Sequence, residues 1–596
     1  MTEGSGVVVS EATDDERRGY NMLLLCVAGL GGLLYGVDVG IIGGALPYLQ
    51  ATSHLSVAQL STIVAAVLLG SVISTIFAGV LADWLGRKPV MVLSGLVFVI
   101  SIPLIALSPS YGQLFLGRLL QGISGGFIGV VVPLYLAECL PSSNRGKGTA
   151  LFQLLLTFGI VAAALIGIYY SYHLQAVAAT ASAAVLFHEK DQAWRHIFWI
   201  SLPPGILFTF GSLFVGESPR WLYRKGSVQQ ALVSLQRSRS AAKAEIEFAE
   251  MKAISATHEA TDKGGDSLLR RKYVIPFLLA CVILFCNTAT GVNSIIGYNT
   301  SILLQSGLSD LVSHWGYVLF TTVNFLMTMV GMMLVDKKGR RFLLILGSTG
   351  LMLSLIVVGS LFWQTERSDM ECRSAVQLMV GPQQELTLRF NSTEAARLLS
   401  ASGFAVPGSV TDHASLAVIY SYGGFTGETA YVRSDDAAAT PIHITREDSV
   451  PTNAVEAFFK NPFANLQAAR SAPLIIQRAR IGKIPSTKHG SLVALALFSF
   501  IAFFAVGPGV CVWLALSELM PTRIRSVGMS IALVINQLVS TALAVVFLPV
   551  ASKYGYSTMF FLFGGFTVIY LVTAVFFLPE TKGKTLGEIE LHFESR

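Results

Sequence analysis

Charged residues are scarce in this chain. Asp, Glu, Lys and Arg make up 13% of its 596 residues, whereas hydrophobic residues make up 53%. Soluble domains rarely combine so little charge with so much apolar surface. Apolar stretches of about 20 residues, long enough to cross roughly 30 Å of hydrocarbon, recur along the whole sequence. The composition therefore predicts an all-α polytopic membrane protein.

Signatures of several enzyme classes are also missing. "GKT" at 583–585 lacks the upstream glycine of a P-loop, and the chain has no HExxH pattern and no clustered Cys/His ligand set. Of the six cysteines, only Cys372 falls in an expected outer loop, which excludes a disulfide framework there. The net charge of +6 comes mostly from short basic loops, so nucleic acid is not an expected partner. We expect no enzyme activity, no cofactor and no metal site.

The apolar stretches predict twelve transmembrane helices. They lie near residues 21–48, 58–82, 89–108, 112–137, 147–171, 196–215, 273–304, 314–335, 341–363, 490–517, 526–550 and 556–578. Basic residues gather in alternate short loops, which the positive-inside bias places in the cytoplasm. We therefore expect a multi-pass protein of the cell membrane with both termini inside. The polar, acidic start of the chain shows no signal-peptide pattern.

The chain also carries an internal duplication. "DWLGRKP" at 83–89 is echoed by "DKKGRRF" at 336–342, and "ECLPSSNR" at 138–145 by "ELMPTRIR" at 518–525. The second pair is about 127 residues farther apart than the first, so the second half contains an insertion. The expected organisation is a cytoplasmic tail (1–20), a six-helix bundle (21–216), a cytoplasmic helical linker (217–272), three helices (273–364), an extracytoplasmic insertion (365–489), three more helices (490–578) and a cytoplasmic tail (579–596).

The insertion reads as a small soluble subdomain. Alternating apolar and polar residues in "SLAVIYSY" and "IHITRE" predict strands, and "NAVEAFFKN" predicts a helix, so an α+β fold is expected. "NST" at 391–393 matches the short glycosylation sequon, which leaves glycosylation of Asn391 open. Solute capture, binding of an unknown partner and neutral decoration all fit the insertion, and a monomer is expected.

The ordered motifs resemble those of the sugar-porter family of the major facilitator superfamily. They include "GVDVGIIGGALPY", "GRLLQGISGG", "ESPRWL", "GVNSIIGYN", "VGPGVCVW" and "LPETKGKTLGEIE". The resemblance implies the major facilitator fold, in which two six-helix bundles rock around a central site. It also implies gating residues, which are Tyr298, Gly507, Pro508 and Gly509. A cytoplasmic charge lattice would comprise Arg87, Glu138, Arg145, Glu217, Arg220, Arg340, Glu518 and Arg525, although these charges could instead only set the topology.

Asp38 is the only charged side chain between Asn21 and Gln50. A carboxylate at a transmembrane helix centre costs roughly 2.5 to 3.5 kcal/mol. Gly36 and the glycines that follow every four residues form a packing face, and Asp38 is turned away from it. Arg118 lies at a similar depth, so we expect the two residues to couple proton and solute movement. The resemblance agrees, since proton-coupled sugar porters carry Asp here, but a permanent structural ion pair is the alternative.

Sugar recognition needs amides and hydroxyls together with an aromatic face. The resemblance offers Gln153, Asn293, Asn324, Trp513 and Asn536 for that role. Asn287 and Thr288 stand where the family usually has two glutamines, which leaves a hexose, a pentose, a polyol, a disaccharide or a non-sugar open. The leading hypothesis is proton-coupled symport of a sugar or polyol. Facilitated diffusion or export and a transporter-like sensor are the alternatives.

Overall fold

The computed structural model describes residues 14–53, 55–261, 271–404, 411–429, 431–435, 441–454, 457, 460–461, 463–520, 524–580 and 593. For residues 142–147, 149, 250, 253–261, 272, 336, 513–517 and 525–527 only the backbone is described. Within the described residues, twelve helical spans are long and apolar enough to cross a membrane, which confirms the number predicted from the sequence.

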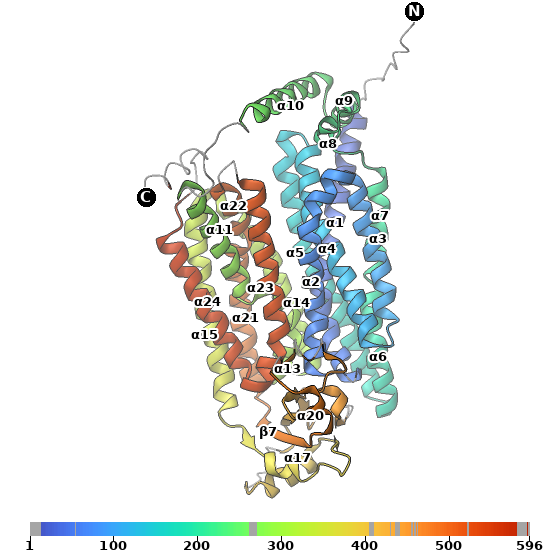
Figure 1. The fold of residues 1–596 in the computed structure, drawn as a ribbon, viewed down its shortest axis with the longest axis vertical. Helices are drawn as coiled ribbons and strands as arrows, with labels where there is room; N and C mark the ends of the chain where they lie inside the picture. The colour runs from blue at the N-terminus through green and yellow to red at the C-terminus, as the bar shows by residue number, and fades with distance from the viewer. Residues whose placement is uncertain are drawn as a thin grey trace, which may run out of the picture.

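The first bundle contains six spans. They are α1 (Asp14–Thr52), α2 (Val57–Leu85), α3 (Arg87–Ala106), α4 (Tyr111–Cys139), α5 (Ser142–Ala178) and the pair α6 (Ala183–Trp199) with α7 (Leu202–Phe214). Short helices α8 (Pro219–Arg224), α9 (Val228–Gln236) and α10 (Ala241–Thr261) then lead toward the second bundle across one end of the molecule (Figure 1). We call this the linker end.

The second bundle also contains six spans, two of which are broken. They are α11 (Arg271–Ala289) with α12 (Val292–Gly297) and α13 (Asn299–Gln305), α14 (Asp310–Lys338), α15 (Arg340–Glu366), α21 (Thr487–Val506) with α22 (Pro508–Leu519), α23 (Arg525–Tyr554) and α24 (Tyr556–Phe576). The sequence predicts a single helix over 273–304. The structure interrupts it at Gly291, whose φ of 81° is a left-handed conformation that favours glycine.

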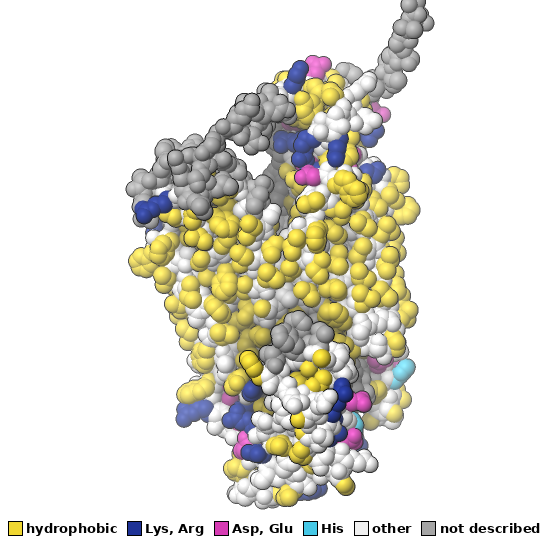
Figure 2. Space-filling view, viewed as in Figure 1, with side chains coloured by type: hydrophobic (Ala, Val, Ile, Leu, Met, Phe, Trp, Pro, Cys, Tyr) yellow, Lys and Arg dark blue, Asp and Glu magenta, His cyan; other side chains and the backbone are white. Residues whose placement is uncertain are grey.

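Helix pairs inside the bundles approach closely through glycine. In the first bundle a Cβ on Gly36 would lie 1.9 Å from the carbonyl oxygen of Leu156 on α5, and one on Gly122 would lie 2.0 Å from that of Val67 on α2. Without a hydrophobic driving force between helices in lipid, such backbone contact provides much of the packing energy. On the face shown in Figure 2, yellow apolar side chains cover both bundles between their two ends.

The insertion between α15 and α21 is an α+β subdomain at the opposite end, which we call the insertion end (Figure 1). Its main antiparallel sheet has the order β1-β7-β3-β4, with β5 also paired to β3, and a second sheet pairs β2 with β6. The strands are β1 (Met370–Glu371), β2 (Leu386–Leu388), β3 (Ala414–Tyr422), β4 (Phe425–Glu428), β5 (Val432–Arg433), β6 (Ile442–Ile444) and β7 (Leu474–Lys483); the helices are α16 (Arg373–Gln377), α17 (Ser392–Ala401) and α20 (Leu466–Ser471).

The predicted strands coincide with β3 and β6, and the α+β character is confirmed. The helix predicted at 453–461 includes residues 455, 456, 458 and 459, which lie outside the described residues. Asn391 is exposed and caps α17, because its Oδ1 accepts a hydrogen bond from the backbone N–H of Glu394 at 2.8 Å.

Two arginines attach the insertion to the second bundle. Nη1 of Arg433 donates to the carbonyl oxygens of Leu304 and Leu308 at 3.2 and 3.4 Å, next to the C-terminus of α13. Nη2 of Arg480 donates to the carbonyl of Lys553 at 2.8 Å, at the C-terminus of α23. Both arginines therefore bind the carbonyl ends of helices, where the helix dipole favours positive charge.

A buried carboxyl at this junction makes the attachment sensitive to pH. Burial raises the pKa of Glu428 from its ordinary value of 4.5 to about 8, although the positive charge of Lys553 lowers this pKa in part. The folded subdomain therefore holds a proton at Glu428 that an unfolded one releases. The contribution of this group to stability is greatest below pH 4.5 and falls as the pH rises toward 8.

We expect Glu428→Gln to remove most of this pH dependence. Hydrogen exchange of β4 and β5 in the wild type should accelerate between pH 5.5 and 8.5, after correction for intrinsic exchange rates. The variant should be more protected at pH 8.5 by on the order of 1 kcal/mol, about fivefold in rate, after discounting for solvent screening. Glu447→Gln, on an exposed position, is the matched control. Equal protection of variant and wild type at both pH values would contradict the prediction.

Candidate functional site

Asp38 is buried in the first bundle on the side of α1 that faces α4. Its side chain is 1% exposed, and a Cβ on Gly125 of α4 would lie 2.8 Å from its Oδ2. Neither carboxylate oxygen has a hydrogen-bond partner among the described residues. A buried ionised carboxylate without partners is costly, whereas a protonated carboxyl is neutral. Because Gly125 has no side chain, it leaves the space that the carboxyl of Asp38 occupies.

Arg118 is the charged neighbour of Asp38, but the two are not hydrogen-bonded. The guanidinium interacts with the carboxylate through its charge alone, while its Nη1 donates to Oε1 of Gln121 at 2.6 Å. Its Cζ also lies 5.4 Å from the ring centre of Phe198, a cation–π contact. Nε of Arg118 and Nε2 of Gln121 have no partner among the described residues. The site thus holds unused donors beside an unused acceptor.

Gln121 is a residue that the sequence analysis missed. It lies one helical turn beyond Arg118 and one turn before Gly125, and its side chain is fully buried. The spacing of three residues in "RLLQ" places the guanidinium and the amide on one face of α4, which is the signal that could have identified it.

Tyr35 connects this site to the second bundle. It lies on α1 one turn before Asp38, and its ring packs where Gly125 and Gly129 have no side chain. Its hydroxyl lies near the side chains of Ser71 on α2 and Gln537 on α23. A movement of α23 relative to α1 therefore acts directly on the residue beside Asp38.

Four of the predicted substrate residues meet at the interface of α11, α12 and α23. Nδ2 of Asn293 donates to Oγ of Ser540 at 2.7 Å, and Nδ2 of Asn536 donates to the carbonyl of Leu284 at 3.0 Å. The hydroxyl of Thr288 bonds to backbone carbonyls, including that of Asn536 at 3.3 Å. Asn287 is buried, and its Oδ1 has no partner among the described residues.

The remaining substrate candidates lie on other helices. Gln153 on α5 is half-buried and Asn324 on α14 is buried, and these two helices pack through Phe158 and Phe325, whose ring centres are 5.8 Å apart. The side chain of Trp513 lies outside the described residues. The structure therefore gathers one group of amides in the second bundle and places Gln153 across the bundle interface.

The bundles are joined at the insertion end by a group of hydrogen bonds. Asp310 of α14 accepts from the hydroxyl of Tyr48 on α1 at 3.2 Å and from that of Ser171 on α5 at 2.5 Å. The hydroxyl of Tyr317 donates to the carbonyl of Gly40 at 2.8 Å. We call these residues the outer closure, because they link α1 and α5 to α14. The sequence analysis missed them.

The predicted gating residues lie at breaks in the helices. Tyr298, between α12 and α13, is fully buried, donates to the carbonyl of Ala544 at 3.0 Å and stacks on Phe547 with ring centres 4.6 Å apart. Gly507 separates α21 from α22, which begins at Pro508. A Cβ on Gly507 would lie 2.5 Å from the carbonyl of Leu343, so α15 packs directly against this break. Gly509 follows in α22, next to Phe504.

At the linker end, charged residues bind within each bundle. In the first bundle Arg87 forms an ion pair with Glu138 at 2.9 Å, and Ser218 also donates to Glu138. Glu217 accepts from the backbone N–H of Arg87 at 3.0 Å, at the N-terminus of α3. Burial raises the pKa of Glu217 above its ordinary value. The backbone N–H groups that donate to its carboxylate lower this pKa in part.

The second bundle repeats this arrangement. Nη2 of Arg340 lies 3.1 Å from Oε1 of Glu518, and Glu580 accepts from the backbone N–H of Arg340 at 3.2 Å. Arg220 is exposed, and Arg224, which the sequence analysis missed, lies 3.1 Å from Asp83. The side chains of the predicted lattice members Arg145 and Arg525 lie outside the described residues.

Two bundles with a duplicated charge motif and a buried carboxyl define a transporter with the major facilitator fold. The sequence profile of the family described as "Sugar (and other) transporter" matches residues 24–380 and 474–593. The chain belongs to this family, within the sugar porters of the major facilitator superfamily. Most of the insertion, residues 381–473, lies outside the matched ranges.

Individual proteins are similar over nearly the whole chain. The glucose transporter GlcP of Staphylococcus epidermidis is 26% identical over 96% of this chain and 97% of its own length. The human proton myo-inositol cotransporter is 26% identical over 98% of this chain and 83% of its own length. The inward-open structure of the xylose transporter XylE from Escherichia coli covers 96% of this chain and all of its own, with a TM-score of 0.63 and 20% identity, which shows the shared fold.

Proposed function

We propose that this protein is a proton-coupled symporter of a sugar or polyol, working by alternating access in the cell membrane. The observation that carries the proposal is Asp38, a buried carboxyl whose oxygens have no hydrogen-bond partner in the part of the chain that the structure describes. A permanent structural ion pair would bring the guanidinium of Arg118 into hydrogen-bond contact, whereas Arg118 binds Gln121 instead. Family membership and the proton myo-inositol cotransporter among the relatives support the same function.

In this proposal the proton follows the position of Arg118. With Arg118 turned toward Gln121, Asp38 carries a proton as a neutral carboxyl. When Arg118 moves to the carboxylate, the attraction between the charges favours ionisation and the proton leaves. Tyr35, which packs against Gly125 beside Asp38 and lies near Gln537, transmits bundle movement to this pair. Proton release and solute release thereby become linked.

The two bundles, 21–216 and 273–364 with 490–578, rock around a central solute site. The residues that line this site are Asn293, Asn287, Thr288, Asn536, Gln153, Asn324 and Trp513. The backbone changes conformation at Tyr298, Gly507, Pro508 and Gly509 when the bundles move. We assign the linker end, with both termini, to the cytoplasm, and the insertion to the outside. The charge lattice, including Arg145, Arg220 and Arg525, joins the bundles at the linker end in the outward-facing state. The protein functions as a monomer.

The proposal is tested with a solute panel in proteoliposomes under an imposed pH gradient. Labelled D-glucose, myo-inositol, L-arabinose and D-xylose are supplied outside, with the lumen alkaline. Accumulation of at least one solute above its external concentration, abolished by a protonophore, is the expected result. Downhill flux alone, unaffected by the gradient, would identify a facilitator.

A transporter-like sensor is the second candidate, favoured by the insertion that the family profile leaves unmatched. It predicts saturable binding of a panel solute without flux. The partner of the insertion would then be the signalling component.

We expect Asn293→Ala to weaken solute binding. Removing the amide leaves Oγ of Ser540 without its donor and deletes one group available to a solute hydroxyl. Loss of one such hydrogen bond costs about 1 to 2 kcal/mol, so the KM should rise roughly tenfold. The measurement is the concentration dependence of initial uptake rate, with Gln229→Ala on exposed α9 as the control. An unchanged KM would remove Asn293 from the site.

A further inference from the structure

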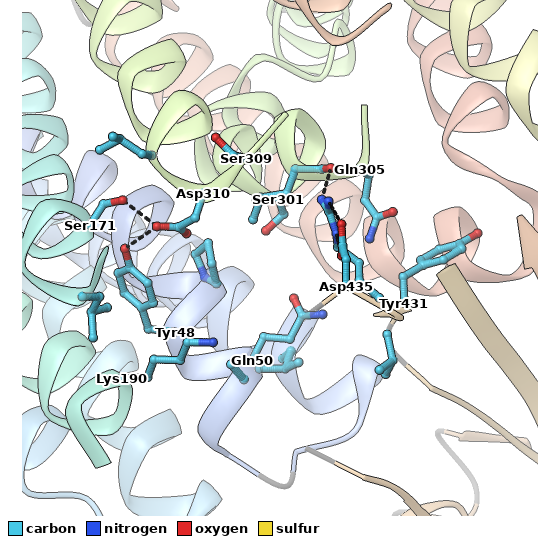
Figure 3. Close-up of a pocket in the computed structure, with 18 of the residues that line it drawn as sticks. Tyr48, Gln50, Ser171, Lys190, Ser301, Gln305, Ser309, Asp310, Tyr431 and Asp435 are labelled. Atoms are coloured by element: carbon cyan, nitrogen blue, oxygen red, sulfur yellow. Dashed lines mark hydrogen bonds and ion pairs between the residues drawn. The ribbon is translucent and has the colours of Figure 1, made fainter. Parts of the chain in front are cut away.

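A cavity of about 500 Å³ lies at the insertion end, beyond the outer closure (Figure 3). We propose that it is a second binding site, a capture site for a neutral polyhydroxylated solute before the bundles open outward. The inference rests on the proposed transport function. None of the residues assigned to the central solute site lines this cavity, so the two sites are distinct.

The walls come from both bundles and from the insertion. Tyr48 and Gln50 belong to α1, Gln305 belongs to α13, and Tyr431 and Arg433 belong to the insertion. In Figure 3, Tyr48 and Asp310 lie on the left of the cavity, Gln305 and Tyr431 lie on the right, and Gln50 lies between them. The insertion therefore adds a third wall to the mouth between the bundles and makes it a partly enclosed pocket. Its volume falls in the range of small-molecule sites, about 300 to 1,000 Å³.

Charges that line the cavity are largely satisfied by the protein itself. Arg433 forms two hydrogen bonds of 2.9 Å to the carboxylate of Asp435, and it donates to the carbonyls next to α13. Asp310 accepts from Tyr48 and Ser171. Lys190 also lines the cavity, and it too interacts with the protein. Because the acidic and basic groups are engaged in this way, the lining favours a neutral solute over an ion.

The polar side chains that remain available for hydrogen bonds to a solute are neutral. Gln50, Gln305 and Ser301 line the cavity, and none of them forms a side-chain hydrogen bond with another residue that the structure describes. An amide offers both donors and acceptors, which matches a solute hydroxyl that donates and accepts. Tyr431 and the apolar side chains of Leu174 and Leu186 supply surface for ring C–H groups. Hydroxyls on an apolar ring are the chemistry of a sugar or cyclic polyol.

Asp310 belongs to both the cavity and the outer closure. Its carboxylate holds the hydroxyls of Tyr48 and Ser171, and it faces the cavity (Figure 3). A solute hydroxyl that donates to Asp310 competes with those two hydrogen bonds. Capture therefore weakens the link between the bundles, which favours opening toward the captured solute.

The test compares the two faces of the transporter with labelled D-glucose and myo-inositol. In proteoliposomes of one orientation, Gln305→Ala and, separately, Gln50→Ala should raise the KM for entry from the outside threefold to tenfold. The KM for exit from the inside should stay within twofold, since the capture site lies outside the closed end. Gln383→Ala, an exposed glutamine of the insertion that does not line the cavity, is the matched control.

Equilibrium binding of the same two probes to the purified full chain separates this inference from the proposed function. Two classes of site are expected, one of which both cavity variants lose. If the cavity variants lose one class of binding site but the wild-type protein transports neither solute, the capture site is supported and the proposed transport function is refuted. If flux is normal and both variants keep the wild-type external KM and stoichiometry, the capture site is refuted. Absence of binding by either probe also refutes it.

Discussion

Asp38→Asn should abolish proton-driven accumulation while solute exchange continues. In proteoliposomes with an imposed pH gradient, we expect the ratio of internal to external solute to fall to one. Exchange of internal for external solute in the absence of a gradient should remain within about twofold of the wild type, since an amide at this buried position mimics the neutral, protonated carboxyl.

The structure explains why this substitution tests coupling rather than folding. Asn has almost the same volume as Asp, and neither oxygen of Asp38 has a hydrogen-bond partner that the change would remove. Gly125 provides the same space for either side chain. The amide also carries no charge, so it removes the cost of a buried carboxylate.

The control for this experiment is Asp412→Asn, at an exposed position in the insertion. It should accumulate solute as the wild type does. Gradient-dependent accumulation by Asp38→Asn would show that another group carries the proton, and the assignment of Asp38 would be lost. Loss of exchange together with accumulation would place Asp38 in the solute pathway itself.

Gly36→Ala should strongly destabilise the first bundle. A Cβ at this position would lie 1.9 Å from the carbonyl oxygen of Leu156 and 2.8 Å from its carbonyl carbon. These are backbone atoms, so α1 and α5 would have to separate along their length. Overpacking of this kind costs about 3 kcal/mol, which corresponds to a fall of roughly 10 °C in the unfolding temperature.

Gly79→Ala provides a matched comparison on α2. No heavy atom lies within 4 Å of the Cβ it would add, and the residue is exposed. Alanine also favours the helix relative to glycine, so this variant should be as stable as the wild type or slightly more stable. Thermal unfolding of the two purified variants, followed by size-exclusion chromatography, measures the difference. Equal unfolding temperatures would contradict the close packing of α1 on α5.

Much of the architecture follows from local patterns in the sequence. Each span is a largely apolar run whose backbone groups must be satisfied within the helix, so its existence can be inferred without its neighbours. Strand β3 is likewise recognisable in "SLAVIYSY", because a short run of β-branched and aromatic residues is a local property, although the strand is buried along nearly its whole length. The break at Gly291 was not recognised, since a left-handed glycine inside an apolar run looks like any other glycine.

The sequence by itself determined the twelve spans, the duplicated halves and the presence of one carboxyl deep in the first helix. Only the tertiary structure decided what surrounds that carboxyl. Gly125 approaches Asp38 from a helix more than 80 residues away, and Asp310 joins residues from three helices at the outer closure. Hydrogen bonds and close backbone contacts between distant segments depend on how helices pack, which hydrophobic periodicity does not encode.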